Sequence, residues 1–212
     1  MDELHAEPLR VVLDTSVFTN PDVAREFGAT PASAFLAFLD LARKTAPRMR
    51  FYMPPSIFAE LRNFLGDVEL PPDFDLIVAL QPPDRHAVRV PGVLLYDMIE
   101  DLRRRIDRGL RLAESAVREG AEAEPERAIA RLRDRYRQAL RAGFLDSRED
   151  VDLVLLARQL GAALASADRG VIEWADRLGV RVLQPTRLRP ALEAVAARRV
   201  ARSAGSSDQS TT

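Results

Sequence analysis

Short apolar runs alternate along the chain with longer amphipathic segments, which is the pattern of an α/β domain. The runs that we expect to form buried parallel strands are residues 9–14, 50–53, 162–167 and 180–183. The segments that we expect to be helical are residues 31–46, 56–65 (with Ser56 as the cap), 147–160, 171–178 and 186–199. The proline-rich stretch 67–91 shows neither the pattern of a strand nor that of an amphipathic helix, so no element is predicted there. The pattern therefore predicts a parallel sheet flanked by helices.

A different pattern interrupts this alternation after Gly92. Apolar residues recur every three or four positions from Leu95 to Val117, which is about six turns of one amphipathic helix. Residues 120–125 break the pattern, and a second amphipathic helix is expected at 128–142. Two long helices joined by a short break predict an antiparallel hairpin. We therefore expect an α/β domain at 9–91 and 143–199, an inserted helical hairpin at 92–142, and a disordered Ser/Thr-rich tail at 200–212.

Composition narrows the classes of function. Hydrophobic residues make up 47% of the 212 residues and charged residues 30%, so a folded globular chain is expected. The net charge of −1 gives no overall basic field, so a nucleic-acid partner has to be recognised by local charge clusters. Lys44 is the only lysine, and arginine carries the remaining positive charge, although GC-rich coding produces the same bias.

Several kinds of site and location are excluded by what the sequence lacks. Without cysteine, the chain has no disulfide framework, zinc ribbon, thiol nucleophile or iron–sulfur cluster. No apolar run approaches the roughly 18 residues of a membrane span, and the acidic N-terminus does not resemble a signal peptide. We therefore expect a cytoplasmic protein without a membrane partner. With two histidines, His5 and His86, enzymatic chemistry would depend on carboxylates and a metal ion.

Acidic residues gather where an α/β sheet places its active site. Asp14 ends the first strand, Asp168 ends a later one, and Glu60 lies on the helix after the second strand. Asp146 and Asp150 are four residues apart at the start of a helix, so they share one helical face. Ligands of open parallel sheets bind at the carboxyl ends of the strands. Crowded carboxylates repel one another unless a hard cation binds, so these acids are expected to hold Mg²⁺ (or Mn²⁺).

Each acid also has a structural interpretation. Strand-end aspartates form turns, and Ser147 with Asp150 can cap a helix. Asp152 is two residues from Asp150 and points away from the shared face. Ser16 and Ser166 are candidate hydrogen-bond donors behind the acids, or ordinary strand-end hydroxyls. Other chemistries fit less well. A haloacid-dehalogenase phosphatase needs an aspartate where Ser16 stands. The absence of a P-loop excludes a P-loop NTPase, and the absence of a Gly-x-Gly-x-x-Gly motif argues against a dinucleotide-binding fold.

The order of the acids is similar to that of the PIN-domain nucleases. Val-Val-Leu-Asp-Thr-Ser at 11–16 carries part of this resemblance, and Phe-Leu-Asp-Ser-Arg-Glu-Asp at 144–150, followed by Ser-Ala-Asp-Arg-Gly at 166–170, is more specific. Together with the inserted hairpin, these stretches resemble the minimal protein-only ribonuclease P family of bacteria and archaea, also called RNA ligase partner proteins. The resemblance covers roughly residues 9–190.

The resemblance implies a PIN-like fold and an endoribonuclease that removes the 5′ leader from precursor tRNA. The family's catalytic and metal-binding aspartates carry over onto Asp14, Asp146, Asp150 and Asp168. Glu60 matches the general PIN acid, and its role as a ligand stays open. In that family the hairpin serves oligomer assembly and recognition of the tRNA body, so the implied partners are precursor tRNA and further copies of the chain, and no DNA is expected.

The hairpin itself carries two features that fit these partners. Its first helix has a longer apolar stripe than the second can cover, which leaves the region of Leu110, Ala113 and Val117 for another subunit. Its second helix carries two rows of candidate RNA-binding residues, Arg127, Arg131 and Arg135, and Arg133, Arg137 and Arg141. A solvated face with ion pairs is the alternative for these rows.

Two alternative functions stay open. One is another PIN-type ribonuclease, such as a toxin that cuts tRNA or messenger RNA, although such chains usually lack a long hairpin. The other is a non-catalytic RNA-binding or assembly partner, in which the acids are structural.

Overall fold

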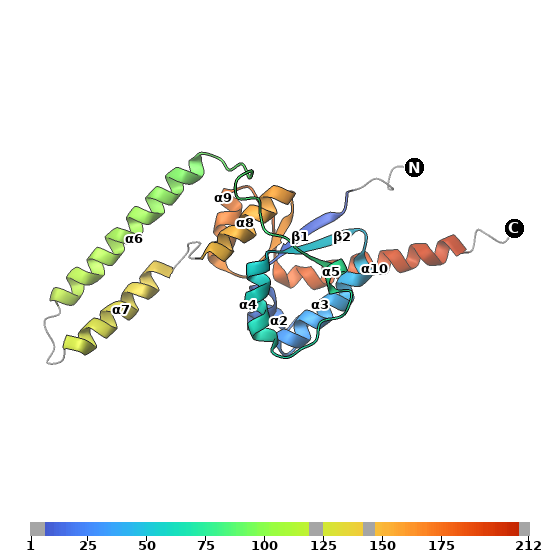
Figure 1. Cartoon of the computed structure of the whole chain (residues 1–212), viewed down its shortest axis with the longest axis horizontal. Coiled ribbons are helices and arrows are strands. Elements are labelled where there is room, and N and C mark those ends of the chain that lie inside the picture. Colours follow the sequence, from blue (N-terminus) through green and yellow to red (C-terminus); the bar gives the residue numbers. More distant parts are fainter. Residues whose placement is uncertain (1–6, 119–124, 142–146, 208–212) are drawn as a thin grey trace. The chain divides into compact units, whose positions relative to one another are not determined.

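The computed structural model describes residues 7–118, 125–141 and 147–207 (Figure 1). The described chain divides into two compact units. The sheet unit comprises Met1–Arg89 and Ser147–Thr212, and the hairpin unit comprises Val90–Asp146. Each unit is described separately below.

The sheet formed by the described residues has five parallel strands in the order β3-β2-β1-β4-β5. The strands are β1 (Leu9–Leu13), β2 (Met49–Met53), β3 (Val78–Leu80), β4 (Ala163–Ala165) and β5 (Val182–Leu183). Strand β1 lies at the centre, where Val11 pairs with Phe51 on one side and Ala163 on the other. The predicted parallel α/β sheet is confirmed. Strand β3 falls in the stretch for which the sequence predicted no element.

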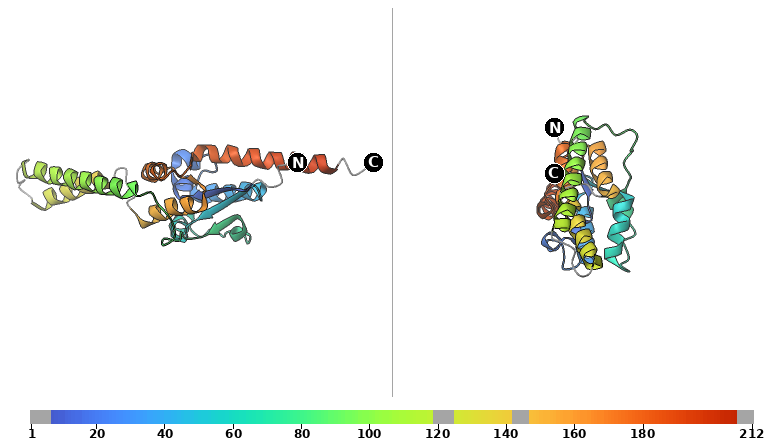
Figure 2. Two further views of the ribbon diagram at one scale, coloured as in Figure 1. Left: turned by 90° about the horizontal axis from the view of Figure 1, so that it is seen from above. Right: turned by 90° about the vertical axis from the view of Figure 1, so that its left-hand side faces the viewer.

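Helices flank this sheet (Figure 2). They are α1 (Ser16–Thr19), α2 (Pro21–Ala24), α3 (Pro31–Thr45), α4 (Pro55–Leu65), α5 (Phe74–Ile77), α8 (Arg148–Leu160), α9 (Arg169–Arg177) and α10 (Pro185–Ser207). Helix α3 packs beside α10, while α8 packs on β1 and β4 (Figures 1 and 2). The short helices α1, α2 and α5 are too brief to produce a helical period in the sequence.

Two predicted helix ends are wrong. Ser56 does not cap α4, because the helix begins at Pro55, with Pro54 at the N-cap. Proline suits the first helical position because its backbone angle fits the helix and it lacks one of the N–H groups that would otherwise need a partner. The predicted disordered tail is helical from residue 200 to Ser207, because the alanine- and arginine-rich run 194–202 favours helix continuation.

The core of the sheet unit is built around β1 and an aromatic cluster. Val11, Val12 and Leu13 are fully buried. The ring of Phe38 lies 5.3 Å from that of Phe18 and 5.1 Å from that of Phe51, measured between centroids. Such edge-on and tilted contacts add to the free energy gained by apolar burial. The end of β1 is therefore a rigid place to attach a functional side chain.

The hairpin unit consists of α6 (Val93–Arg118) and α7 (Pro125–Arg141), which pack against each other. Gly109 is buried at their contact, where an added Cβ would lie 2.4 Å from Cε2 of Tyr136. The glycine therefore permits close packing of the tyrosine ring of α7 on α6. No helix formed by the described residues is long and apolar enough to cross a membrane.

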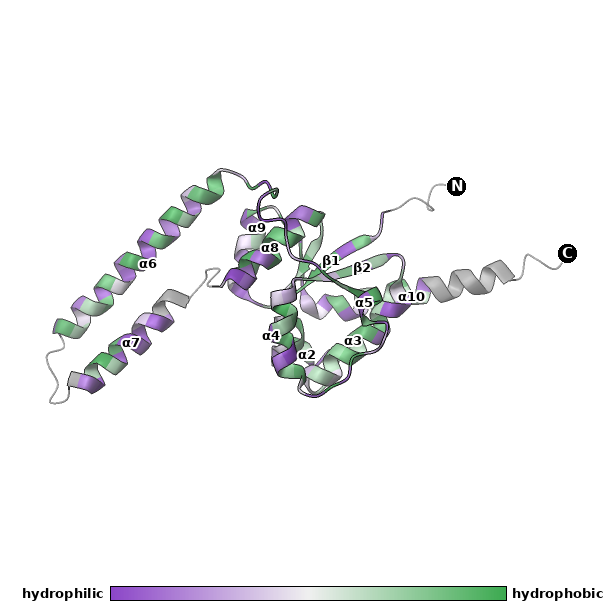
Figure 3. Ribbon diagram, viewed as in Figure 1, coloured by the Kyte–Doolittle hydropathy of each residue, from purple (hydrophilic) through white to green (hydrophobic). Residues whose placement is uncertain are grey.

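Most of the apolar stripe of α6 stays exposed in the single chain. Hydrophobic and hydrophilic bands alternate along the helix (Figure 3). Leu102, Ile106 and Leu110 are each 55–58% exposed, and Leu95 and Val117 are exposed as well. The uncovered surface therefore extends along nearly the whole helix rather than only over the region of Leu110, Ala113 and Val117, and Ala113 is itself half-buried.

Candidate functional site

Asp14 directly follows the central strand and is fixed by its backbone. Its N–H donates to the carbonyl oxygen of Ala165 at 3.0 Å, which extends the pairing of β1 with β4 by one residue. The residue is only 6% exposed, so its carboxyl group lies at the carboxyl edge of the sheet but largely out of water. Open parallel sheets bind their ligands at this edge.

Two serine hydroxyls hold the Asp14 carboxyl group. Ser16 and Ser166 donate to the same oxygen, Oδ2, with oxygen–oxygen distances of 2.5 and 2.6 Å. Each hydroxyl also accepts a backbone N–H, from Ala167 at 2.9 Å for Ser16 and from Asp168 at 3.0 Å for Ser166. Because both hydroxyl oxygens already accept an N–H, their protons point to the carboxylate. The loop 166–168 after β4 and the end of β1 are thereby joined through one carboxyl oxygen.

The surroundings of Asp14 raise its pKa above the ordinary value. Burial is the largest cause, since it removes the ionised carboxylate from water. The hydrogen bonds from Ser16 and Ser166 act in the opposite direction, and the nearby charge of Asp168 raises the pKa further. A positive charge placed at this edge would favour the ionised form.

Asp168 and Ser147 begin the two helices that bring further acids to this edge. Asp168 caps α9, because its Oδ1 accepts the N–H of Val171 at 2.9 Å. Ser147 caps α8 by accepting the N–H of Asp150 at 3.0 Å, as the structural interpretation of this pair expected. Asp150 is half-buried in the first turn of α8. Asp168 therefore caps α9 and at the same time lies close enough to Asp14 to be part of the same site.

Glu60 and Glu149 extend this group of acids. The pKa of Glu60 is raised by partial burial, by the charge of Asp14 and by the charge of Glu149. Glu60 thus lies within electrostatic range of both acids, although it belongs to α4 and Glu149 to the first turn of α8. Sequence reasoning did not single out Glu149. Its position directly before Asp150 in the motif 144–150 was the available signal.

The structure gives the remaining predicted acids different places. Asp146 lies outside the described residues. Asp152 is buried and forms an ion pair with Arg85, so it has a partner of its own. Within the described part of the chain, no three acidic or histidine side chains already stand close enough to hold a metal ion. The donors gathered at this edge are carboxylate and hydroxyl oxygens, which suit a hard cation such as Mg²⁺ or Mn²⁺.

Comparison with known proteins shows which family the chain resembles. Residues 10–197 match the family described as PINc domain ribonuclease. The RNA-free ribonuclease P of Pyrococcus abyssi is 43% identical over 187 residues, which cover 87% of this chain and 92% of the relative. The protein of the same name from Halorhodospira halophila is 44% identical over 189 residues, covering 88% and 91%.

A third relative, the RNA-free ribonuclease P of Thermodesulfovibrio yellowstonii, is 41% identical over 180 residues, which cover 85% of this chain and 91% of the relative. The similarity thus spans both units, and it includes the segments on which Asp14, Glu60, Asp150 and Asp168 stand. The chain therefore belongs to the PINc-domain endoribonucleases and, within them, to the RNA-free ribonuclease P family.

Proposed function

We propose that this protein removes the 5′ leader from precursor tRNA by metal-assisted hydrolysis, with Asp14, Asp146, Asp150 and Asp168 around the reacting phosphate. The observation that carries the proposal is the buried Asp14 carboxyl group, held by Ser16 and Ser166 at the edge where further acids gather. The names of the similar proteins support the substrate, because these proteins are called ribonuclease P.

A divalent ion fits the oxygen donors of this edge. We assign Asp14 and Asp150 as direct ligands, and Asp146 and Asp168 as ligands that bind directly or through water. When bound, Mg²⁺ or Mn²⁺ supplies positive charge that lowers the pKa of a water molecule and stabilises the leaving oxygen. Burial and the charge of Asp168 raise the pKa of Asp14, so a cation bound at this edge would favour its ionised form.

The side chains of the site have separate tasks in this proposal. Ser16 and Ser166 fix one oxygen of Asp14, so the carboxyl group does not have to be ordered when substrate binds. Glu60 adds negative charge near Asp14, and Glu149 adds negative charge near Glu60, so both strengthen the attraction for a cation. His86 is exposed on the loop after β3, and His5 lies outside the described residues. Within the described ranges, His86 has no second histidine with which to form a pair for attack by the RNA 2′-hydroxyl.

We propose that the hairpin unit joins copies of the chain. The exposed apolar side chains of α6, among them Leu102, Ile106 and Leu110, form a stripe that a second copy can cover. Burial of the same stripe on two subunits would produce a symmetric contact. Charged residues flank the stripe, which is the usual composition of an interface rim.

We also propose that the arginine rows of α7 bind the phosphates of the tRNA body. Arg133 and Arg137 are exposed, and Arg137 pairs with Asp134 at 3.2 Å in an exchangeable surface ion pair. Arg127, Arg131 and Arg135 are exposed too, and each already has a contact. The side chain of Arg141 lies outside the described part. Arginine forms forked hydrogen bonds with phosphate, which suits this role.

Incubation with a 5′-extended precursor tRNA and Mg²⁺ tests the proposed activity. We expect a tRNA with a 5′-phosphate and a leader with a 3′-hydroxyl, because activated water is the nucleophile. Mapping of both product ends measures this, and EDTA should abolish the reaction. Cleavage elsewhere in the RNA would indicate another PIN-type ribonuclease, and a 2′,3′-cyclic phosphate would contradict the mechanism.

Asp150→Asn should lower the cleavage rate by about a hundredfold or more while leaving precursor tRNA binding intact, because it removes one negative ligand with little change of shape. Single-turnover kinetics and a filter-binding titration measure the two quantities. Asp75→Asn is the matched control, since Asp75 is an exposed aspartate of α5. A variant that cleaves normally but melts at a lower temperature would show that Asp150 is structural.

Glu60→Gln should raise the free energy of unfolding near neutral pH when metal is absent. The pKa of Glu60 is raised in the folded state. Its contribution to the free energy of unfolding is therefore fully present below its ordinary pKa of 4.5, and this contribution is lost as the pH rises through the raised value. Glutamine carries no charge, so the gain should appear at about pH 8 and vanish at about pH 4. Urea titrations in EDTA at both pH values measure it. Equal stability of the two proteins at both values would place Glu60 outside the acid group.

Leu102→Glu with Ile106→Glu should shift the protein from an oligomer to a monomer, because charge cannot be buried without a partner at the centre of an apolar interface. Light scattering at micromolar concentration measures the mass. Leu76→Glu provides the control, because Leu76 is 88% exposed but belongs to α5 of the sheet unit. A wild-type monomer would refute self-association.

Replacement of Arg133, Arg137 and Arg141 by glutamine should weaken precursor binding. It should also reduce the salt dependence, measured as the slope of the logarithm of the binding constant against the logarithm of the salt concentration, by up to about three units, at ~0.7–0.9 per phosphate contact. The rate at saturating RNA should change far less. The exposed arginines Arg181, Arg187 and Arg198 of the sheet unit provide a control variant of equal charge change. If the α7 variant binds with wild-type affinity and wild-type salt dependence, the arginine rows of α7 have no role in RNA binding.

A further inference from the structure

The loop after β3 is tied to α8. Its backbone turns at Asp84, whose Oδ1 accepts the N–H groups of His86 and Ala87, each at 3.1 Å. The N–H of Asp84 itself donates to Oε1 of Gln159, near the end of α8, at 2.7 Å. One side of the loop is therefore anchored to the last turn of the helix that carries Asp150 in its first turn.

A second tie joins the same loop to the middle of α8. Arg85 donates to both carboxylate oxygens of Asp152, from Nε to Oδ1 at 2.9 Å and from Nη2 to Oδ2 at 2.5 Å. The Asp152 side chain is only 6% exposed, whereas that of Arg85 is 62% exposed. The arginine therefore approaches from the solvent side and neutralises a carboxylate buried within the fold. Such a two-bond pair fixes direction as well as distance.

Helical spacing relates these two contacts to the acids in the first turn of α8. Residues 149, 152, 156 and 159 recur every three or four positions and so share one face of α8, on which the loop contacts Asp152 and Gln159. Asp150 lies on a different face, with Leu153 and Ala157, which are buried. Arg85 also lies within electrostatic range of Glu149, and Glu149 lies within that of Glu60. Arg85 is thus connected, through α8, to the acids around Asp14.

We propose that Arg85 is a positioning residue for the reaction: it holds the first turn of α8, and with it Asp150 and Glu149, in place for metal binding. This inference rests on the proposed function of the acid group. Arg85 touches no reacting atom in this role. It acts through its two hydrogen bonds to Asp152, which tie α8 to the loop after β3 and also give the buried carboxylate its counter-charge.

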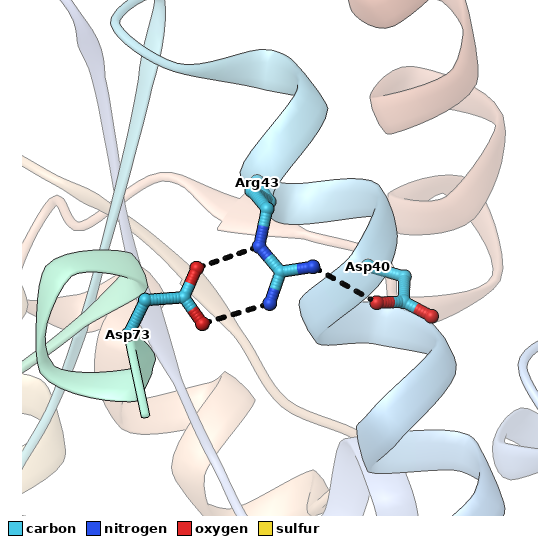
Figure 4. A network of polar contacts seen from close by, with 3 residues as sticks. All are labelled: Asp40, Arg43 and Asp73. Atoms are coloured by element: carbon cyan, nitrogen blue, oxygen red, sulfur yellow. Dashed lines mark hydrogen bonds and ion pairs between the residues drawn. The ribbon is translucent and has the colours of Figure 1, made fainter. Parts of the chain in front are cut away.

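The chain contains a matched pair away from the acids (Figure 4). Arg43 of α3 donates to both oxygens of Asp73, from Nε at 2.7 Å and from Nη2 at 2.8 Å, and also to Asp40 at 3.2 Å. The geometry is the same two-bond arrangement, but the Asp73 side chain is 35% exposed. Asp73 directly precedes α5, not the helix that carries Asp150. A variant of Arg43 therefore controls for the loss of an arginine–aspartate pair as such.

The test compares Arg85→Gln, Arg85→Lys and Arg43→Gln in the full-length protein. Mn²⁺ affinity without RNA is measured by titration followed by electron paramagnetic resonance, alongside kcat, KM for precursor tRNA and the melting temperature. Arg85→Gln should weaken Mn²⁺ binding and lower kcat at limiting metal by about tenfold or more, with little change in KM. Lysine should restore part of both losses, because it keeps the charge without the fork. Arg43→Gln should change neither.

A double variant, Arg85→Gln with Asp152→Asn, keeps the test decisive if the single change prevents folding, because it leaves no buried charge without a partner. It should fold and still bind Mn²⁺ more weakly than wild type. Wild-type Mn²⁺ affinity and kcat in the Arg85 variants would overturn the inference, as would a raised KM with a flatter salt dependence, which would make Arg85 an RNA contact. If wild type does not cleave precursor tRNA, the proposed function fails, and the Mn²⁺ titration still decides the role of Arg85.

Discussion

The hydrogen bonds from Ser16 and Ser166 to one oxygen of Asp14 are the interaction on which the site depends. They connect the end of the central strand to the loop after β4, and that loop in turn begins α9 at Asp168. A buried carboxyl group without these donors would be costly and free to rotate. With them it is fixed before any ligand binds.

Acids held at one edge of the sheet repel one another when ionised, and the fold compensates this repulsion only in part. Burial and the charge of Asp168 raise the pKa of Asp14, and Asp14 and Glu149 raise that of Glu60. The N-termini of α8 and α9 bring partial positive charge close to Asp150 and Asp168, and Arg85 compensates Asp152. The remaining repulsion is what a divalent cation would remove, so the same feature that strains the free protein favours metal binding.

The sequence predicted the central parts of this arrangement because they depend on local pattern. Apolar runs marked β1, β2, β4 and β5, and acids at the ends of two of them marked the edge. Strand β3 was not predicted, since three residues at a sheet edge are too few to show an alternating pattern. Ser56 was predicted to cap α4, but the helix already begins at Pro55. The pair of Arg85 and Asp152 spans 67 residues of sequence, so only the folded chain shows it.

The central claim is that Asp14 and Asp150 bind a divalent ion at the carboxyl edge of the sheet. A crystal structure of the protein with Mn²⁺, analysed by anomalous scattering, measures this most directly. The account predicts a peak within about 2–2.5 Å of a carboxylate oxygen of Asp14, with Asp150 as a further ligand. A fully occupied Mn²⁺ site elsewhere on the chain, with the Asp14 carboxyl group contacted only by Ser16 and Ser166, would contradict it.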